Sequence, residues 1–348
     1  NKGGEYRKWF GNDLFVVNWE NDGWDLQNTL HPSGERIWAH NFNLDYIFSP
    51  SISWSDITSG GLSVRFFPEG YIFDCTGQSA FEKDGGLYRY SAAAICNSIV
   101  GSLVAPILNP TMHFKSGDFS QIPFIEADWR EVEDKVRRLI QTSKLDWDEH
   151  EASWEFSLPP LLCSVNKAKN LIESYRCLKS NWHIRISETR ITEIQINENI
   201  LNLYGLQDDL TSDIPLAKVT LTCNPHYRYS GDLTDGEREA RLKSDTMREL
   251  ISYAVGCMMG RYSLAEPGLI YAHSGGVDFD PSRYGAFPAD DDGIIPLTEE
   301  QWFADDAAAR IEEFLGIAWP DAPVLETLTT LMDGLSMGNA GEPRAALR

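Results

Sequence analysis

The chain has 348 residues, a formal net charge of −22 and 42% hydrophobic residues. This length indicates two or three domains, and the hydrophobic content is sufficient for sizeable cores. The net charge argues against a protein that binds nucleic acid over its whole surface, but residues 231–348 carry −13 of it. A local basic groove elsewhere is compatible with this balance, because salt screens exposed charges separated by more than ~8 Å.

Composition also disfavours membrane, secreted and metal-binding proteins. No run of about 18 apolar residues is present, so no membrane span is expected. Residues 1–13 are polar and lack the apolar segment of a secretory signal. The six cysteines include no CxxC pair and the seven histidines no HxxxH pair. We therefore expect a cytoplasmic protein with reduced thiols and without a metal site.

Residues 1–125 are expected to form a β-rich domain. Residues 13–19 favour a strand. Residues 60–74 favour a hairpin, because two aromatic and β-branched runs are joined at 68–70. Residues 87–105 are small or apolar, and the length and alanine content of this stretch favour a helix over a strand.

Helices dominate the pattern after Ile125, which makes the whole chain α+β: a β-rich domain followed by a mainly helical part. We divide this part into a helical spacer or bundle at 126–230 and an acidic helical region at 231–348. The helices are expected at 126–144, 160–180, 187–205 with Gly205 as C-cap, from Thr234, and from Thr298. The last two starts are capping boxes, with Glu237 and Gln301 as the partner residues.

The stretch 220–229, TLTCNPHYRY, is similar to the loop that holds the flipped base in amino-methylating DNA methyltransferases. That loop reads Asn or Asp, Pro, Pro, then Tyr or Phe, and here His226 stands at the second proline. Such enzymes also need a glycine-rich turn after a strand to hold S-adenosylmethionine. No such turn precedes Asn224, so we interpret Asn224 to Tyr227 as a turn with a packed tyrosine.

Longer segments carry a resemblance to a known family. Residues 202–229 and 247–272 are similar to the C-terminal region of PglX, the adenine-specific DNA methyltransferase of BREX phage-defence systems. Residues 3–23, 57–81 and 114–124 are similar to the target-recognition domain of that family. The likeness extends over nearly all of the chain to about residue 320.

The resemblance implies a role in reading double-stranded DNA for an adenine-specific methyltransferase. The methyltransferase domain would precede this chain and would hold S-adenosylmethionine, so we expect no catalytic residue and no cofactor here. The partners implied are duplex DNA, the protein's own N-terminal methyltransferase domain and other BREX proteins. We expect the chain alone to be inactive.

Candidate DNA contacts are side chains that read base edges or bind phosphate. In the β-rich domain they are Arg36, His40, Ser53, Trp54, Ser55, Arg65, Lys83, Arg89 and Lys115. In the helical part, Lys169, Arg176 and Lys179 are spaced to share one helix face. Each has an alternative: Trp54 as a core residue, Arg65 as a surface or salt-bridged residue, and the helical cations as an ordinary solvated face.

Two other functions remain open. The acidic last third favours a scaffold that docks protein partners, which is compatible with DNA recognition. Eleven tryptophans and many carboxylates suit a carbohydrate-active protein. The lack of an export signal and of a glycosidase motif argues against this last function.

Overall fold

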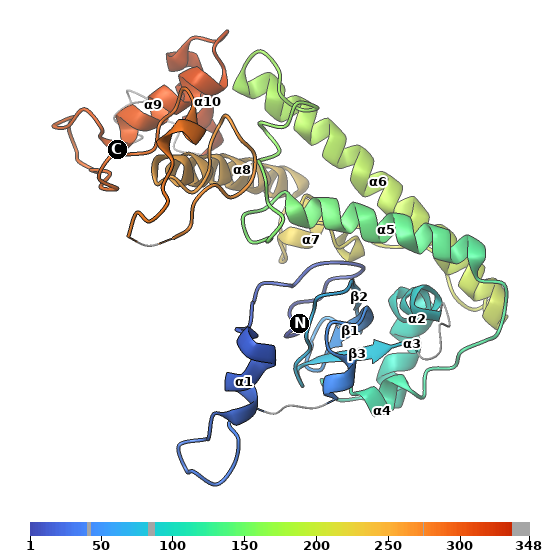
Figure 1. Ribbon diagram of the computed structural model, residues 1–348. Helices are drawn as coiled ribbons and strands as arrows, with labels where there is room; N and C mark the ends of the chain where they lie inside the picture. Colours follow the sequence, from blue (N-terminus) through green and yellow to red (C-terminus); the bar gives the residue numbers. More distant parts are fainter. Residues whose placement is uncertain (40–42, 83–87, 274, 336–348) are drawn as a thin grey trace. The chain divides into compact units, whose positions relative to one another are not determined.

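The computed structural model describes residues 1–39, 43–82, 88–273 and 275–335 and has the expected α+β fold (Figure 1). Its contacts divide the chain into two compact units. Unit 1 comprises Asn1–Lys144 and Thr189–Pro215, and unit 2 comprises Leu145–Glu188 and Leu216–Arg348. Each unit is therefore discontinuous in sequence, which differs from the three consecutive domains with boundaries at 125 and 230.

A small antiparallel sheet forms the centre of unit 1. Its strands are β1 (Ser51–Ser55), β2 (Val64–Phe67) and β3 (Gly77–Phe81), in the order β2-β1-β3. Ile52 and Trp54 alternate with serines along β1, so the period of two places both on one face of the sheet. That face packs against the helical layer of α2 (Tyr88–Asn97) and α3 (Ile99–Leu108) (Figure 1).

Two strand predictions were wrong. The run around Val64 pairs with β1 and not with residues 71–74, although the turn at Gly70 exists with φ +95°. Residues 13–19 form no strand, and the side chains of Phe15 and Val16 are 64% and 70% exposed. The residue types at 13–19 and 60–74 favour extended backbone in both cases. A strand also needs a neighbouring strand to pair with, and the pattern of residues along one segment does not identify that neighbour.

The single helix expected over 87–105 is bent by 79° between α2 and α3. Ser98 lies at the break, where its hydroxyl accepts hydrogen bonds from the amides of Val100 and Gly101 and so caps α3. A Cβ at Gly101 would lie 2.4 Å from the carbonyl oxygens of Ile95 and Cys96. Glycine therefore permits the close approach of the two helices.

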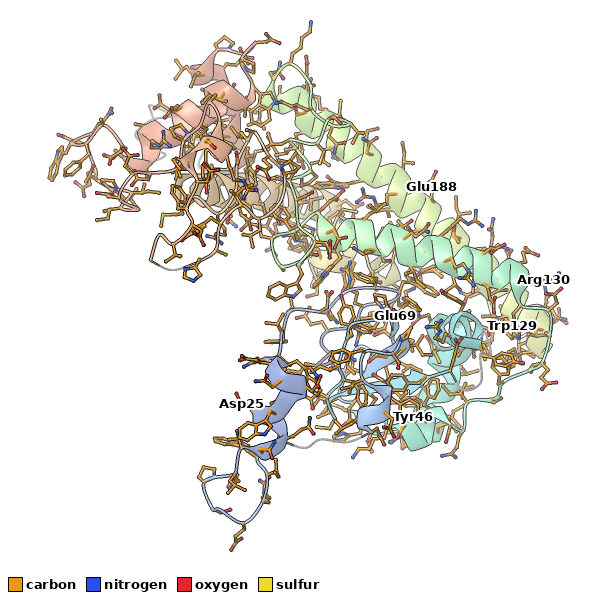
Figure 2. All side chains as sticks on the ribbon, in the orientation of Figure 1. Asp25, Tyr46, Glu69, Trp129, Arg130 and Glu188 are labelled. Carbon is orange, nitrogen blue, oxygen red and sulfur yellow. The ribbon has the colours of Figure 1, made fainter. Side chains whose placement is uncertain are left out.

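Helix α2 is packed on two sides, which explains its small residues. Ala93 and Cys96 contact the sheet, whereas Ala94 and Ile95 pack in a second cluster. That second cluster contains residues of α5 (Arg130–Asp148), of the end of α6 (Leu171–Tyr204) and Trp129, which Figure 2 labels. Side chains larger than alanine would force these layers apart.

The backbone groups on the outer edge of β2 are hydrogen-bonded to other parts of unit 1. The amide of Asn97 accepts from the Val64 N–H at 2.8 Å and donates to the Val64 carbonyl at 2.9 Å. Trp9 adds a parallel bridge to Arg65, with its own N–H donating to the Val64 carbonyl at 2.9 Å. No strand of the described residues pairs with the outer edge of β3. An edge of this kind leaves backbone groups available for other partners.

A buried carboxylate fixes the N-terminal segment to α6 within unit 1. Glu193 Oε1 lies 2.6 Å from Lys8 Nζ and accepts from Trp9 Nε1 at 2.6 Å. Lys8, Trp9 and Glu193 are each 2% exposed. The two charges are thus removed from water together, and their mutual attraction offsets part of the cost of burying them.

The remaining helices confirm some predicted boundaries and correct others. The helix expected at 160–180 begins only at Leu171 and is continuous with the one expected at 187–205. This helix, α6, ends at Tyr204, before the predicted C-cap Gly205 with φ +68°. Helix α8 has the predicted capping box of Thr234 and Glu237. The last predicted start was wrong, because Thr298 precedes a loop and Asp306 caps the next helix. The bounds are α1 Glu20–Asn28, α4 Ser116–Phe119, α7 Pro225–Arg228, α8 Asp235–Met258, α9 Ala307–Ala318 and α10 Val324–Gly334.

We predict that Glu193→Gln lowers the free energy of unfolding of unit 1 by about 3–5 kcal/mol, because it removes one charge of a buried ion pair. Urea denaturation with hydrogen exchange of the unit 1 amides measures the change. Glu198→Gln is the matched control, since Glu198 lies on the same helix and is exposed. Equal effects of the two substitutions would contradict the assigned role.

Candidate nucleic-acid interface

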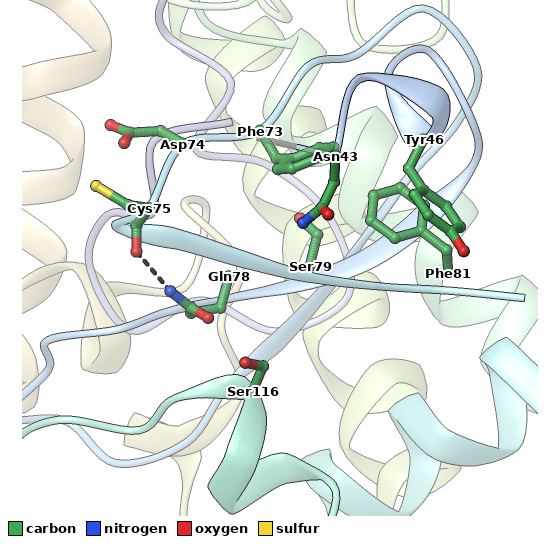
Figure 3. A pocket seen from close by; sticks show the side chains of 9 residues that line it. All are labelled: Asn43, Tyr46, Phe73, Asp74, Cys75, Gln78, Ser79, Phe81 and Ser116. Carbon is green, nitrogen blue, oxygen red and sulfur yellow. Dashed lines mark hydrogen bonds between the residues drawn. The ribbon is translucent and has the colours of Figure 1, made fainter. Parts of the chain in front are cut away.

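A pocket of about 360 Å³ lies along the open edge of β3 in unit 1 (Figure 3). Its volume is at the lower end of the range of about 300–1,000 Å³ for small-molecule sites. It brings together three segments that are distant in sequence. The lining residues are Asn43, Tyr46, Phe73, Asp74, Cys75, Gln78, Ser79, Phe81 and Ser116.

Aromatic side chains form one end of the pocket. The ring centroids of Tyr46 and Phe81 are 5.1 Å apart, and those of Phe73 and Phe81 are 5.2 Å apart. Tyr46 ends the short 3-10 turn Leu44–Tyr46 and is 41% exposed. Contacts between the rings hold each in place, so the cluster offers a fixed apolar surface to a ligand.

Amide and hydroxyl groups line the middle of the pocket, where Figure 3 shows Asn43, Ser79, Gln78 and Ser116 around the opening. Gln78 Nε2 donates to the Cys75 carbonyl at 2.5 Å. This bond orients the side-chain oxygen of Gln78 as an acceptor. The pocket can therefore both donate and accept hydrogen bonds.

Asp74 and Cys75 lie at the end opposite the aromatic rings (Figure 3). Partial burial acts to raise the pKa of Asp74, but hydrogen bonds from Cys75 and Thr76 outweigh it and hold this pKa below its usual value. The hydrogen bond to Asp74, together with burial, raises the pKa of the Cys75 thiol. At neutral pH this end is thus a carboxylate beside a protonated thiol.

Two predicted contact residues are exposed in unit 1. Lys115 directly precedes Ser116 of the pocket and begins α4, with its N–H donating to Asp118 Oδ2 at 2.8 Å. Arg36 lies in the exposed loop after α1, and its guanidinium donates to the carbonyl of Ile37 at 3.2 Å. Both charged groups can reach phosphate oxygens in this conformation.

Arg89 is half-buried and already engaged. Its Nε lies 3.0 Å from Glu82 Oε2, and its guanidinium lies 5.4 Å from the ring centroid of Phe66. Release of Arg89 to DNA would cost these contacts. His40 and Lys83 lie outside the residues that the structure describes.

Four predicted contacts lie in the interior of unit 1. The Ser53 hydroxyl donates to the Gln78 carbonyl at 2.6 Å and that of Ser55 to the Gly4 carbonyl at 2.7 Å. Arg65 is 0% exposed and donates to the Arg7 carbonyl and to Ser55 Oγ, both at 3.3 Å. Trp54 is also 0% exposed, donates to the Phe114 carbonyl at 2.7 Å and stacks on Phe119. In this conformation these side chains are buried and hydrogen-bonded within the scaffold of unit 1.

The predicted cationic face of unit 2 is not a single helix face. Lys169 precedes α6, which begins at Leu171, so the expectation that it shares a helix with the other two was wrong. Arg176 is exposed, and Lys179 forms an ion pair with Glu239 at 2.8 Å.

The expected turn at Asn224 to Tyr227 is a single turn of helix, α7, and the packed side chain is that of Asn224, whereas Tyr227 is half-buried. Asn224 is 0% exposed and caps α7, with its amide nitrogen donating to the carbonyls of Leu216 and Val219 at 2.8 Å. Its oxygen accepts from the His226 N–H at 3.1 Å. The amide has no group left over for a base, because the backbone of unit 2 uses both of its ends.

Sequence comparisons relate the whole chain to two curated proteins. It is 36% identical over 342 residues to the adenine-specific methyltransferase BrxX of Escherichia coli O9:H4 (strain HS). It is 33% identical over 366 residues to the adenine-specific methyltransferase PglX of Lacticaseibacillus casei (strain Zhang). The chain is homologous to one region of these methyltransferases. This confirms the resemblance to PglX found in the sequence.

The matches cover 97% and 100% of this chain but only 27% and 28% of BrxX and PglX. The chain thus spans about a quarter of the length of these relatives. No family model matches it.

Two further observations concern the described residues only. They contain no group of three or more metal-ligating side chains that could hold an ion. None of their helices alone is long and apolar enough to cross a membrane; α2 and α3 meet that criterion only as a bent pair.

We predict that Trp54→Ala destabilises unit 1 by about 3–5 kcal/mol, as expected when a buried tryptophan is truncated. Trp24→Ala provides the control, because Trp24 is 61% exposed in the same unit and its loss should change stability by no more than about 0.5 kcal/mol. Chemical denaturation of both variants tests the prediction. If the Trp54→Ala variant were stable and had an altered DNA affinity, the structural role would be contradicted and Trp54 would count as a DNA contact.

Proposed function

We propose that the chain is the DNA-recognition part of an adenine-specific DNA methyltransferase of BREX phage defence. The observation that carries the proposal is homology over 97–100% of the chain to proteins named as adenine-specific methyltransferases. Methyl transfer from S-adenosylmethionine belongs, in this proposal, to the larger part of the parent protein. The chain would then bind duplex DNA, work beside its own methyltransferase domain in the cytoplasm and be inactive alone.

Several features of the described residues support unit 1 as the part that binds DNA. Arg36 is exposed in the loop after α1, and Lys115 is exposed at the N-cap of α4. The β3 pocket adds amide and hydroxyl groups of the kind that read base edges.

We predict that the chain enriches one sequence from a random duplex library and binds it with strong salt dependence. Each phosphate contact contributes about −0.9 to the slope of log affinity against log salt. Arg36→Gln and Lys115→Gln should therefore each make the slope shallower by about that amount in fluorescence anisotropy titrations.

Arg248→Gln is the matched control, because Arg248 is an exposed arginine on α8 in unit 2 and should leave the slope unchanged. Failure to enrich any sequence would contradict sequence-specific reading. If the slope of log affinity against log salt were unchanged in both unit 1 variants, Arg36 and Lys115 would not be phosphate contacts.

A second candidate function, protein docking, is favoured by one loop of unit 2. Residues 284–309 contain seven carboxylates and no lysine or arginine. Four large apolar side chains are exposed among these charges: Ile294, Leu297, Trp302 and Phe303, with Trp302 at 72%. Exposed apolar groups in an acidic setting suit a basic protein surface and repel DNA.

The ends of this loop are anchored, so its apolar side chains are presented from fixed positions. The Asp290 N–H donates to the Met258 carbonyl at 2.7 Å, and the Ala307 N–H donates to the Pro296 carbonyl at 2.8 Å. We predict that a photo-crosslinking amino acid at position 302 of the full protein crosslinks to a protein in cells. The same group at Thr329, an exposed site on α10, should not. Equal crosslinking from both positions would contradict docking through the loop.

A further inference from the structure

The β3 pocket has the chemistry of a site for a single nucleobase. We propose that it takes up one base that has swung out of the DNA stack, a proposal that rests on the DNA-recognition function above. A pocket of about 360 Å³ has room for a flat heterocycle. The edge of a base pair that remains stacked in a duplex could not enter it.

The aromatic end supplies the stacking surface. Tyr46 is 41% exposed, and its ring lies against Phe81, which in turn contacts Phe73. Bases removed from a duplex lose their stacking energy, and an aromatic side chain restores it. Stacking of a base on a protein ring is sequence-tolerant, since every base has a π-face.

The middle of the pocket supplies hydrogen bonds to the edge of the base. The oxygen of Gln78 accepts, the amide of Asn43 can do both, and the hydroxyls of Ser79 and Ser116 adapt to either role. Proteins read flipped bases in this way, through hydrogen bonds to the Watson–Crick edge between stacking side chains.

Charge decides which part of a nucleotide can enter. The described residues that line the pocket include no cation, and hydrogen bonds hold Asp74 in its ionised form. A phosphate is therefore repelled from the interior, whereas Lys115 next to Ser116 can hold it outside. Adenine, cytosine and guanine carry an exocyclic amino group that donates to a carboxylate. Thymine lacks this group, so the pocket should favour the three amino-bearing bases.

The test uses three DNA probes: a fully paired duplex, the same duplex with one bulged adenine, and the same duplex with one bulged thymine. Unstacking costs least for an unpaired base. We expect the adenine bulge to bind at least about tenfold more tightly than the paired duplex, and more tightly than the thymine bulge, in anisotropy titrations. Tyr46→Ala removes one stacking contact and Gln78→Leu removes the hydrogen-bonding amide, so each should reduce this preference by about tenfold and should leave the affinity for paired DNA unchanged.

Tyr88→Ala is the control, because Tyr88 is an exposed tyrosine of the same unit outside the pocket and its loss should preserve the preference. If the chain binds the paired duplex without preferring a bulge, the base pocket is refuted and DNA recognition stands. The pocket is also refuted if both pocket variants keep the preference. Absence of binding to all three probes would instead overturn the proposed function on which the pocket rests.

Discussion

The architecture of unit 1 depends on the buried carboxylate of Glu193. By compensating Lys8 and accepting from the indole of Trp9, it fixes the N-terminal segment beside α6. Trp9, held there, bridges to β2, and Asn97 completes the closure of that edge. A sheet of three strands has two edges, so closure of one leaves β3 as the side where other groups can bind. The pocket lies beside β3, the strand whose outer edge no strand of the described residues covers.

Features governed by neighbours in sequence could be predicted, and features governed by distant partners could not. The capping box at Thr234 and the C-cap at Gly205 involve residues within one turn, and both are present. The run around Val64 looked like half of a hairpin, but its partner is β1, because tertiary contacts choose between equally suitable strands. Arg65 looked accessible on a half-buried strand. It is buried because the segment around Arg7 covers that face, and no pattern near Arg65 signals this.

The candidate site shows the same limit. Lys115 could be named from its charge and its loop, and it is exposed near the pocket. The sequence did not identify Asn43, Gln78 and Ser116 as site residues, because polar residues of this kind are common and only the fold brings these three together. The acidic loop of unit 2, by contrast, can be recognised from its amino-acid composition alone. Charge patterns are visible in a sequence, whereas concave sites made from several segments are not.

The discontinuity of unit 1 constrains how such a chain can be recombined. Residues 189–215 belong to the same compact unit as residues 1–144, although a stretch of unit 2 separates them in sequence. A crossover that exchanged only the first stretch between two homologues would set Lys8 and Trp9 from one parent against position 193 from the other. Exchange of an intact unit 1 between homologues therefore requires that both stretches come from the same parent, or that both parents have a glutamate at position 193. Modularity in this chain is a property of its folded contacts and not of a continuous gene segment.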